Sequence, residues 1–501
     1  MTSIKKILIA NRGEIAVRVI RTSREMGIKT VAVYSEADKA SKHVRLADEA
    51  VYIGESQAQA SYLNQTAILK AAKDRNADAI HPGYGFLSEN AEFAKKVAEA
   101  GLIFIGPPHE AIRLMGDKTE AKKIMVAAKV PVVPGTEDAI ATPEEAQNIA
   151  KKIGYPVLLK AAAGGGGKGM RIVESPADMR SQFERAASEA GAAFGDSRIF
   201  LEKYLKKPRH IEFQIFVDHF QNAVHLYERE CSIQRRHQKV VEEAPSSLLD
   251  EDMRQKMGAV ATQAALACKY TNAGTVEFLV DEQKNFYFLE MNTRLQVEHP
   301  VTEMITGLDL VRLQIEVAQG QPIPFQQSEI KAQGHAIECR IYAEDPKNNF
   351  LPYTGKITHL ETPDGPGVRE DSGVAAGDEV SMFYDPMLAK LVAHAHDRKQ
   401  AILRMLRALG EYRISGVVTT IPFCEWVLKH PRFQAGDIDT GFIDQEFFSK
   451  DVNEILGFTE DEENKIAIAA VLFEMLNSKD FSTQKAEKVQ SSGWRQRGWK
   501  N

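Results

Sequence analysis

The chain has 501 residues, of which 44% are hydrophobic and 26% are charged, and its formal net charge is −6. This much apolar surface excludes a chain that is disordered over most of its length, and the net charge argues against bulk attraction to nucleic acid or anionic lipid. No apolar run approaches the roughly 20 residues that a membrane-spanning helix needs. The four cysteines form no Cys-x-x-Cys pair, so neither a disulfide framework nor a cysteine zinc site is expected, and a cytoplasmic location fits best.

Residues 1–114 alternate between short apolar runs and stretches with helical spacing. The apolar runs are Lys5–Ala10, Thr30–Tyr34, Ala79–Ile80 and Ile103–Gly106. This alternation predicts a doubly wound α/β domain, in which a parallel sheet lies between two layers of helices. The turn Asn11–Glu14 lacks the Gly-x-Gly-x-x-Gly spacing of a dinucleotide site, and Glu14 stands where a pyrophosphate would lie, so NAD binding is rejected.

Two further regions and a tail follow. Residues 115–330 are predicted to form an α+β region, because apolar strand-like runs at 155–160, 170–173, 199–201, 210–217 and 223–230 lead to a hairpin over 274–292. Prolines at positions 322 and 324 mark a linker to a strand-rich region over 331–447. In the tail, residues 448–501, a capping-box start at Thr459–Glu462 precedes an apolar helix over 466–476. That helix is apolar nearly all round, so we expect it to be covered on more than one side.

A glycine-rich loop, Gly164–Gly169, joins two apolar strands. Successive glycine N–H groups and the cationic Lys168 suit a phosphate. The loop is not a P-loop, because a strand rather than a helix follows it. The pattern predicts a flap over the phosphates of a nucleotide, with Lys160 at the end of the preceding strand reaching them. The alternatives are a flexible hairpin tip and a solvated lysine.

Two carboxylates, Glu277 and Glu290, face each other in the predicted hairpin if its turn is centred between Gln283 and Lys284. Such a pair is repulsive unless a cation lies between the two groups. Asn292 points to the same side as Glu290, because strand side chains alternate. Three oxygen ligands without histidine or cysteine predict a site for Mg²⁺ (or Mn²⁺) that carries nucleotide phosphates. The alternative is a solvent-facing pair.

The segment after the hairpin carries Arg294, Gln296 and Glu298 at alternate positions, which places them on one side of an extended chain. Arg294 can hold a planar oxyanion through two hydrogen bonds, and Glu298 can remove a proton from it. The three side chains therefore predict a small-anion pocket with its own base. The alternative is a surface ion pair.

Together these motifs resemble those of biotin carboxylase, the ATP-grasp subunit of biotin-dependent carboxylases of the pyruvate and acyl-CoA carboxylase type. The resemblance covers roughly residues 3–447 and rests on the glycine loop and six more segments: Ile9–Ala16, His81–Glu89, Met115–Lys118, Arg235–Lys239, Glu290–Pro300 and Glu338–Arg340. It implies an N-terminal domain over 1–114, an ATP-grasp domain over 115–330 with a glycine-loop lid over about 131–204, and a strand-rich C-terminal domain over 331–447. It also implies that ATP phosphorylates bicarbonate to carboxyphosphate, and that biotin on a carrier protein is then carboxylated.

The resemblance assigns roles to individual residues. For ATP it implies Lys118, Lys160, Gly165, Gly166, Gly167, Glu202, Lys203, Leu205, His210, Gln234 and His237, and for the metal ion Glu277, Glu290 and Asn292. For bicarbonate it implies Arg294, Gln296, Val297, Glu298 and Lys239, and for biotin Arg340, Tyr84 and Asp385. Its catalytic residues are Glu298 as the base, Arg294, Lys239, and Arg340 as the cation beside the biotin enolate.

Partners follow from the same resemblance. No Ala-Met-Lys-Met biotinylation motif is present, so we expect a separate biotin carboxyl carrier protein, a carboxyltransferase subunit and a homodimer, with no nucleic acid or membrane partner. Trp494 and Trp499, among basic residues, predict that the tail docks a partner subunit; the alternative is a tail folded onto its own C-terminal domain. The final acceptor stays open among acetyl-CoA, propionyl-CoA, pyruvate and other oxo acids. Two other functions are kept as alternatives: an ATP-grasp carboxylate–amine ligase that uses an acyl phosphate, and a catalytically inactive scaffold homologue.

Overall fold

The computed structural model describes residues 3–136, 138–161, 170–194, 196–236, 238–457 and 460–477. The chain divides into a compact unit, residues 1–451, and a second unit, residues 452–501. The predicted phosphate contacts Gly165, Gly166 and Gly167, the predicted ATP residue His237 and the two tail tryptophans lie outside the described residues. Across the described part of the chain, no helix is both long and apolar enough to cross a membrane.

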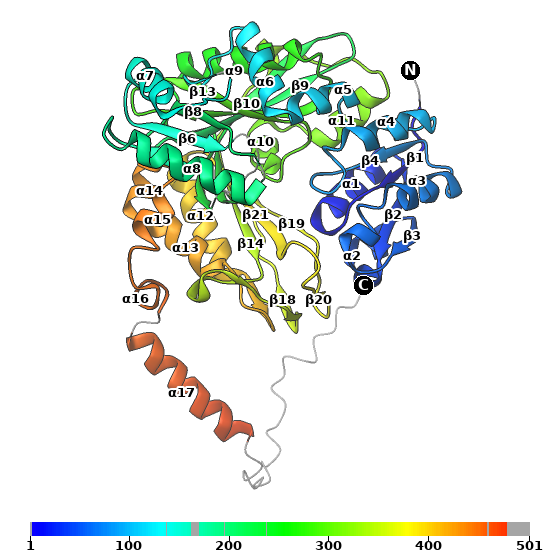
Figure 1. Cartoon of the computed structure of the whole chain (residues 1–501). Helices are drawn as coiled ribbons and strands as arrows, with labels where there is room; N and C mark the ends of the chain where they lie inside the picture. Colours follow the sequence, from blue (N-terminus) through cyan, green and yellow to red (C-terminus); the bar gives the residue numbers. More distant parts are fainter. Residues whose placement is uncertain are drawn as a thin grey trace, which may run out of the picture. The chain divides into compact units, whose positions relative to one another are not determined.

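The N-terminal region forms the predicted doubly wound layers (Figure 1). Its five parallel strands have the order β3–β2–β1–β4–β5. Their bounds are β1 Lys6–Ile9, β2 Lys29–Ser35, β3 Glu49–Gly54, β4 Ala79–His81 and β5 Ile103–Phe104, and the helices are α1 Gly13–Glu25, α2 Lys42–Leu46, α3 Gln65–Asp74, α4 Ala91–Glu99 and α5 His109–Gly116. Alternation along β1 sends Ile7 and Ile9 into one apolar core and Leu8 into another, so both faces of the sheet are covered.

A small antiparallel sheet with the order β7–β6–β8 occupies the region predicted as the lid. The strands of this sheet are β6 Val157–Ala161, β7 Arg171–Val173 and β8 Ile199–Lys203, and the helices of the same region are α7 Pro143–Ile153 and α8 Met179–Phe194. The sheet has an apolar core of its own, which includes Leu159, Phe183 and Leu201. This part of the chain therefore packs as a small layer of its own beside the large central sheet (Figure 1).

The large antiparallel sheet has eight strands in the order β13–β12–β9–β10–β11–β14–β21–β19. The strands are β9 Arg209–Val217, β10 Ala223–Arg235, β11 Gln238–Ala244, β12 Asn272–Val280, β13 Phe286–Asn292, β14 His335–Tyr342, β19 Val368–Ser372 and β21 Met387–Ala395. Because β11 pairs with β14, one continuous sheet crosses the position near residue 330 where the sequence predicts a domain boundary. The predicted site residues on β9 to β13 and on β14 therefore belong to one continuous sheet.

Helices and short strands complete the compact unit. The helices are α6 Lys118–Ala127, α9 Glu251–Ala267, α10 His299–Thr306, α11 Leu310–Ala318, α12 Arg398–Glu411, α13 Ile421–Lys429, α14 Pro431–Ala435 and α15 Phe442–Glu446. The short strands are β15 Glu344–Asp345, β16 Leu351–Pro352, β17 Gly355–Lys356, β18 His359–Glu361, β20 Glu379–Val380 and β22 Arg413–Ser415.

Strand alternation decides which face of the large sheet carries polar groups. Along β9, Ile211, Phe213 and Ile215 enter the apolar core that includes residues of α9. The intervening residues His210, Glu212 and Gln214 lie on the opposite face, and they are buried as well. A strand with buried charges on one face requires partners for them, and these partners form the site described next.

The second unit contains α16 Val452–Leu456 and α17 Glu460–Asn477, which includes the predicted apolar helix. In α17 the side chains of Ile468, Phe473 and Leu476 are 61%, 68% and 79% exposed. The covering that the sequence predicts for this helix is thus not supplied by the described residues.

Candidate active site

The predicted carboxylate hairpin is present, with one correction. Glu277 on β12 lies directly opposite Glu290 on β13. Nearer the turn Phe278 pairs with Phe288, so the turn is centred on one residue rather than between two, and the predicted centring is wrong. Leu289 is an extra residue in β13, a bulge that restores the facing of the two carboxylates.

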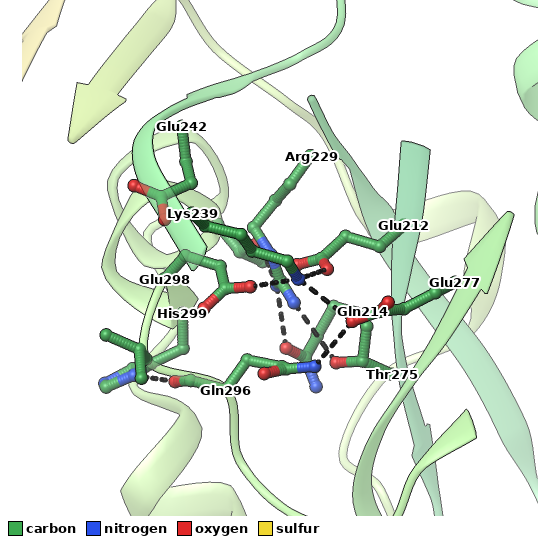
Figure 2. A network of polar contacts seen from close by, with 12 residues as sticks. Glu212, Gln214, Arg229, Lys239, Glu242, Thr275, Glu277, Gln296, Glu298 and His299 are labelled. Carbon is green, nitrogen blue, oxygen red and sulfur yellow. Dashed lines mark hydrogen bonds and ion pairs between the residues drawn. The ribbon is translucent and has the colours of Figure 1, made fainter. Parts of the chain in front are cut away.

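Lys239 on β11 lies at the centre of a buried network (Figure 2). Its Nζ donates to three carboxylates: Glu212 at 2.5 Å, Glu298 at 2.7 Å and Glu277 at 2.9 Å. Burial disfavours the ammonium, but these carboxylates outweigh it and hold the pKa of Lys239 well above its usual value. Lys239 is therefore a fixed positive charge that joins the metal hairpin to the predicted base.

Glu298, at the start of α10, is held between two cations. One carboxylate oxygen accepts from Lys239, and the other accepts from Arg340 on β14 at 2.9 Å. The side chain is 1% exposed, and although burial raises its pKa, Lys239 and Arg340 together hold the pKa of Glu298 well below the usual value. The surface ion pair that the sequence left as an alternative is excluded by this burial. At neutral pH Glu298 is ionised, which is the form a general base needs.

Arg340 has a second partner that sequence reasoning did not single out. Its Nε donates to Glu242 on β11 at 2.6 Å. Burial raises the pKa of Glu242 to about 7, although Arg340 opposes this. The guanidinium thus lies between an ionised carboxylate, Glu298, and one that titrates near neutrality.

Glu212 and Arg229 form a fully buried pair beneath Lys239, and the sequence analysis missed both. Arg229 donates to Glu212 at 2.5 Å, to Gln214 at 2.8 Å and to Thr275 at 3.1 Å. The pair helps to fix the position of Lys239, because Glu212 accepts hydrogen bonds from both Arg229 and Lys239. A signal was present in the sequence: polar residues recur at every second position of an otherwise apolar strand, residues 210–214.

The predicted anion pocket is assembled by hydrogen bonds along the segment after the hairpin. Arg294 donates to Gln296 at 2.8 Å and to Asn292 at 3.2 Å, and Gln296 donates to Glu277 at 3.2 Å. Arg294 also donates at 2.8 Å to Glu89, a residue of the N-terminal region to which no role was assigned. The partly buried guanidinium thus stays charged, because Glu89 outweighs the effect of burial and raises the pKa of Arg294.

The hairpin fits a hard divalent cation. Partial desolvation and the facing Glu277 carboxylate raise the pKa of Glu290, which is the expected effect of two like charges with no cation between them. Glu277 accepts from the amide of Asn292 at 2.8 Å, so the three predicted ligands are neighbours. Among the described residues, two clusters of His, Cys, Asp and Glu also lie within ligand distance, His210–Glu212–Glu277 and Glu212–Cys231–Glu298. Both include Glu212, which already accepts from Arg229 and Lys239. Glu277 is bonded to Lys239 as well, but Glu290 has no ion pair with a cation among the described residues, so the Glu277–Glu290–Asn292 set fits a cation better.

The predicted ATP residues are only partly brought together. Lys160 and Glu202 form an ion pair within the small sheet, and Lys122 lies 3.5 Å from Glu202. Lys203 instead donates to the carbonyls of Gly154 and Tyr155. The remaining described ATP residues are Lys118 at the start of α6, Leu205 after β8, Gln234 on β10, and His210, which is 2.9 Å from Glu277.

Of the three predicted biotin residues, Arg340 is bonded to Glu298, whereas Asp385 and Tyr84 have other partners. Burial raises the pKa of Tyr342 to about 12, and the side chain is close enough to Arg340 and Asp385 for the guanidinium to lower its pKa and the carboxylate to raise it. Asp385 is exposed and accepts from the Met387 amide at 2.9 Å. Tyr84 is fixed through its backbone carbonyl, which accepts from Asn11 at 2.7 Å.

Comparison with protein families gives three matches that together cover most of the chain. Residues 3–112 match the biotin carboxylase N-terminal domain, residues 117–326 match the carbamoyl-phosphate synthase L chain ATP-binding domain, and residues 338–445 match the biotin carboxylase C-terminal domain. The chain is 54% identical over 440 residues to a biotin carboxylase of Nostoc sp., covering 88% of this chain and 98% of that protein.

Longer relatives and solved structures give the same picture. The chain is 52% identical over 471 residues to the human mitochondrial propionyl-CoA carboxylase alpha chain and 54% identical over 441 residues to a Dictyostelium discoideum methylcrotonoyl-CoA carboxylase subunit alpha. It spans 64% and 63% of their lengths, and the alignments cover 93% and 88% of this chain. Among solved structures, a Campylobacter jejuni biotin carboxylase–ATP complex is 50% identical, with 89% of this chain and 99% of that chain covered and a TM-score of 0.83. The biotin carboxylase domain dimer of Hydrogenobacter thermophilus 2-oxoglutarate carboxylase, in complex with MgADP, ADP and bicarbonate, is 47% identical, with 92% and 100% covered and a TM-score of 0.83.

Proposed function

This chain belongs to the biotin carboxylase family, and we propose that it carries out the ATP- and bicarbonate-dependent carboxylation of biotin, the first half-reaction of a biotin-dependent carboxylase. The observation that carries the proposal is the buried position of Glu298 between Lys239 and Arg340. This position places one base between two cations, each suited to a different half-reaction. A carboxylate–amine ligase would not require a second cation, Arg340, beside the base.

In the first step Glu298 removes the proton of bicarbonate, and the oxyanion so formed attacks the γ-phosphate of ATP to give carboxyphosphate and ADP. Bicarbonate is a poor nucleophile until it is deprotonated, so a carboxylate base is required. Arg294, Gln296 and the backbone of Val297 hold the anion beside Glu298. Lys239 places a fixed positive charge where negative charge gathers during phosphoryl transfer.

The nucleotide and its metal ion are assigned to the neighbouring groups. Glu277, Glu290 and Asn292 would hold Mg²⁺ or Mn²⁺, and the ion would neutralise charge on the phosphates. Lys118, Lys160 and the glycine loop contact the phosphates, whereas Glu202, Lys203 and Leu205 bind adenine and His210, Gln234 and His237 lie on the ribose side. The pairing of Lys160 with Glu202 supports this assignment, because it keeps both side chains on one face of the small sheet.

In the second step the ureido nitrogen of biotin bonds to the carboxyl carbon of carboxyphosphate, and the bond from that carbon to the phosphate oxygen breaks. The phosphate that leaves takes the ureido N–H proton, so the products are carboxybiotin and inorganic phosphate. Arg340 stabilises the biotin enolate that forms when this proton leaves, because a guanidinium stays charged at any working pH. Tyr84 and Asp385 line the biotin side. The position of Tyr342 close to both Arg340 and Asp385 supports a common biotin site for Arg340 and Asp385.

We propose that biotin arrives on a carrier protein and that a carboxyltransferase subunit uses the carboxybiotin. A homodimer is supported by the H. thermophilus relative, which is described as a domain dimer.

We assign the tail to docking of a partner subunit. The alignment with the human propionyl-CoA carboxylase alpha chain covers 93% of this chain and is long enough to reach into α17. The expected cytoplasmic location stays a prediction, since bacterial and mitochondrial relatives are equally similar.

The test uses the purified chain with ATP, Mg²⁺, bicarbonate and a high concentration of free biotin, and it measures ADP and acid-labile carboxybiotin. We expect ADP formation to require bicarbonate and to rise with biotin, with carboxybiotin formed in parallel. ATP hydrolysis that ignores biotin but responds to an amine and a carboxylic acid would favour the carboxylate–amine ligase. A folded chain that binds ATP without turnover would favour the inactive scaffold.

A further inference from the structure

Lys390 is a fully buried lysine to which the proposed reaction assigns no role. It lies in β21, where it pairs in register with Arg340 of β14, so the two side chains lie on the same face of the sheet. Its side chain is 0% exposed. A buried ammonium is costly unless it is paired and hydrogen-bonded, so its partners indicate what it does.

The first partner of Lys390 is the backbone next to the base. Its Nζ donates to the Val297 carbonyl at 2.8 Å, and this carbonyl belongs to the peptide group that leads into Glu298. The preceding carbonyl, that of Gln296, is 2.8 Å from Nδ1 of His299. Both carbonyls just before α10 are therefore held by side chains, which fixes the direction in which the Glu298 side chain leaves the chain.

The second partner of Lys390 belongs to the N-terminal region. Nζ is 3.2 Å from Glu14, whose side chain is 2% exposed and which lies in the first turn of α1. Burial raises the pKa of Glu14 to about 7, although Lys390 opposes this, so the carboxylate depends on the lysine. The first turn of α1 also packs against Gly373, where an added Cβ would come within 2.5 Å of the Glu14 nitrogen. The counter-ion of Lys390 is thus held in place by close packing.

We propose that Lys390 is a positioning residue for the bicarbonate step. It holds the Val297 carbonyl so that the segment from Gln296 to Glu298 keeps the base between Lys239 and Arg340, and Glu14 serves as the counter-ion that allows the ammonium to be buried. The inference rests on the proposed function, because it gives Lys390 a task only if this segment binds bicarbonate.

The test compares Lys390→Met with the double variant Lys390→Met/Glu14→Gln in the full chain. Methionine keeps the unbranched shape but removes the donor and the charge. We expect kcat/KM for bicarbonate to fall about ten- to hundredfold, the effect of losing a charged hydrogen bond, while KM for ATP changes little. The single variant also leaves Glu14 buried without its cation, so its melting temperature should fall. The double variant should regain the melting temperature but not the kinetics for bicarbonate.

Arg254→Met is a matched control for loss of a buried ion pair. Arg254 donates to Glu228 at 2.9 Å and has no hydrogen bond to the bicarbonate segment among the described residues, so this variant should lose stability and keep its KM for bicarbonate. Normal bicarbonate kinetics in a folded Lys390→Met, or in the double variant, would overturn the proposal, because Lys390 would then only neutralise Glu14. Failure of the proposed function itself would look different: the unsubstituted chain would show no bicarbonate-dependent ADP formation.

Discussion

Replacing Glu298 with glutamine tests the assignment of the base most directly. Glutamine keeps the volume of the side chain and one hydrogen-bond acceptor but cannot take the proton of bicarbonate. Loss of a general base lowers turnover about 10²–10⁴-fold, which corresponds to about 3–5 kcal/mol of activation free energy. We therefore expect bicarbonate-dependent ADP formation to fall by that factor.

The structure also sets the cost of this change to stability. Lys239 keeps its bonds to Glu212 and Glu277, and Arg340 keeps its bond to Glu242, so neither cation is left without a carboxylate. The loss in the free energy of unfolding should then stay within about 1–3 kcal/mol, the range for a buried hydrogen bond to a charged group. The variant should fold, and its affinity for ATP should be close to that of the unsubstituted chain.

The assay measures ADP release with and without bicarbonate, and nucleotide binding by calorimetry. Glu338→Gln is the matched control. Glu338 is 0% exposed, neither of its carboxylate oxygens has a hydrogen-bond partner among the described residues, and burial raises its pKa well above the usual value. Glutamine there replaces one neutral group with another, so turnover should be nearly unchanged. Turnover at the unsubstituted rate in a folded Glu298→Gln variant would refute the reasoning.

Four further outcomes are expected. Arg340→Ala should abolish carboxybiotin formation while bicarbonate-dependent ADP release persists; a parallel loss of both in a folded variant would place Arg340 in the first step as well. Glu290→Gln should raise the Mg²⁺ concentration for half-maximal activity by at least about tenfold, as expected for loss of a charged ligand; an unchanged Mg²⁺ titration would remove Glu290 from the metal site. Burial lowers the pKa of His81 to about 4, so the stability that its neutral form provides is present above pH 6.5 and is lost as the pH falls to 4. The free energy of unfolding, measured with denaturant, should therefore fall by about 3 kcal/mol between these pH values. In His81→Asn the free energy of unfolding should depend less on pH over this range. A chain ending at Asp451 should keep the carboxylation of free biotin but lose co-purification with its partner subunit, and an intact complex would contradict the docking role of the tail.

The parts of the site that the sequence predicts are those that one short stretch of chain brings together. Strand alternation places Glu277, Glu290 and Asn292 on one side, and the same rule places Arg294, Gln296 and Glu298 along the next segment. Even here the facing of the two carboxylates depends on a bulge, because the true turn is shorter than the one assumed. The run Phe286–Leu289 is apolar at every position, so the hydrophobic pattern does not show that Leu289 is the inserted residue.

The residues that sequence reasoning missed come from distant strands and are recognised only by their partners. Glu212 on β9 accepts from Lys239, Glu242 on β11 accepts from Arg340, and Arg229 on β10 donates to Glu212. Glu212 alternates with His210 and Gln214, which is a signal in the sequence, but the strand patterns do not tell which distant residue each charge will meet. Pairing between strands far apart in the sequence is the information that the pattern alone does not contain.

The charge balance around Glu298 links the two substrates of the first step. Burial alone would raise the pKa of Glu298, but Lys239 and Arg340 hold it well below the usual value. A carboxylate held so firmly is a weak base, because the ability to accept a proton falls with the pKa. Lys239 is shared among three carboxylates, and the phosphates of ATP would compete for the same ammonium. Each bond that Lys239 gives up to a phosphate lets the pKa of Glu298 rise, so we expect the base to become effective toward bicarbonate only when the nucleotide that will receive the attack is already in place.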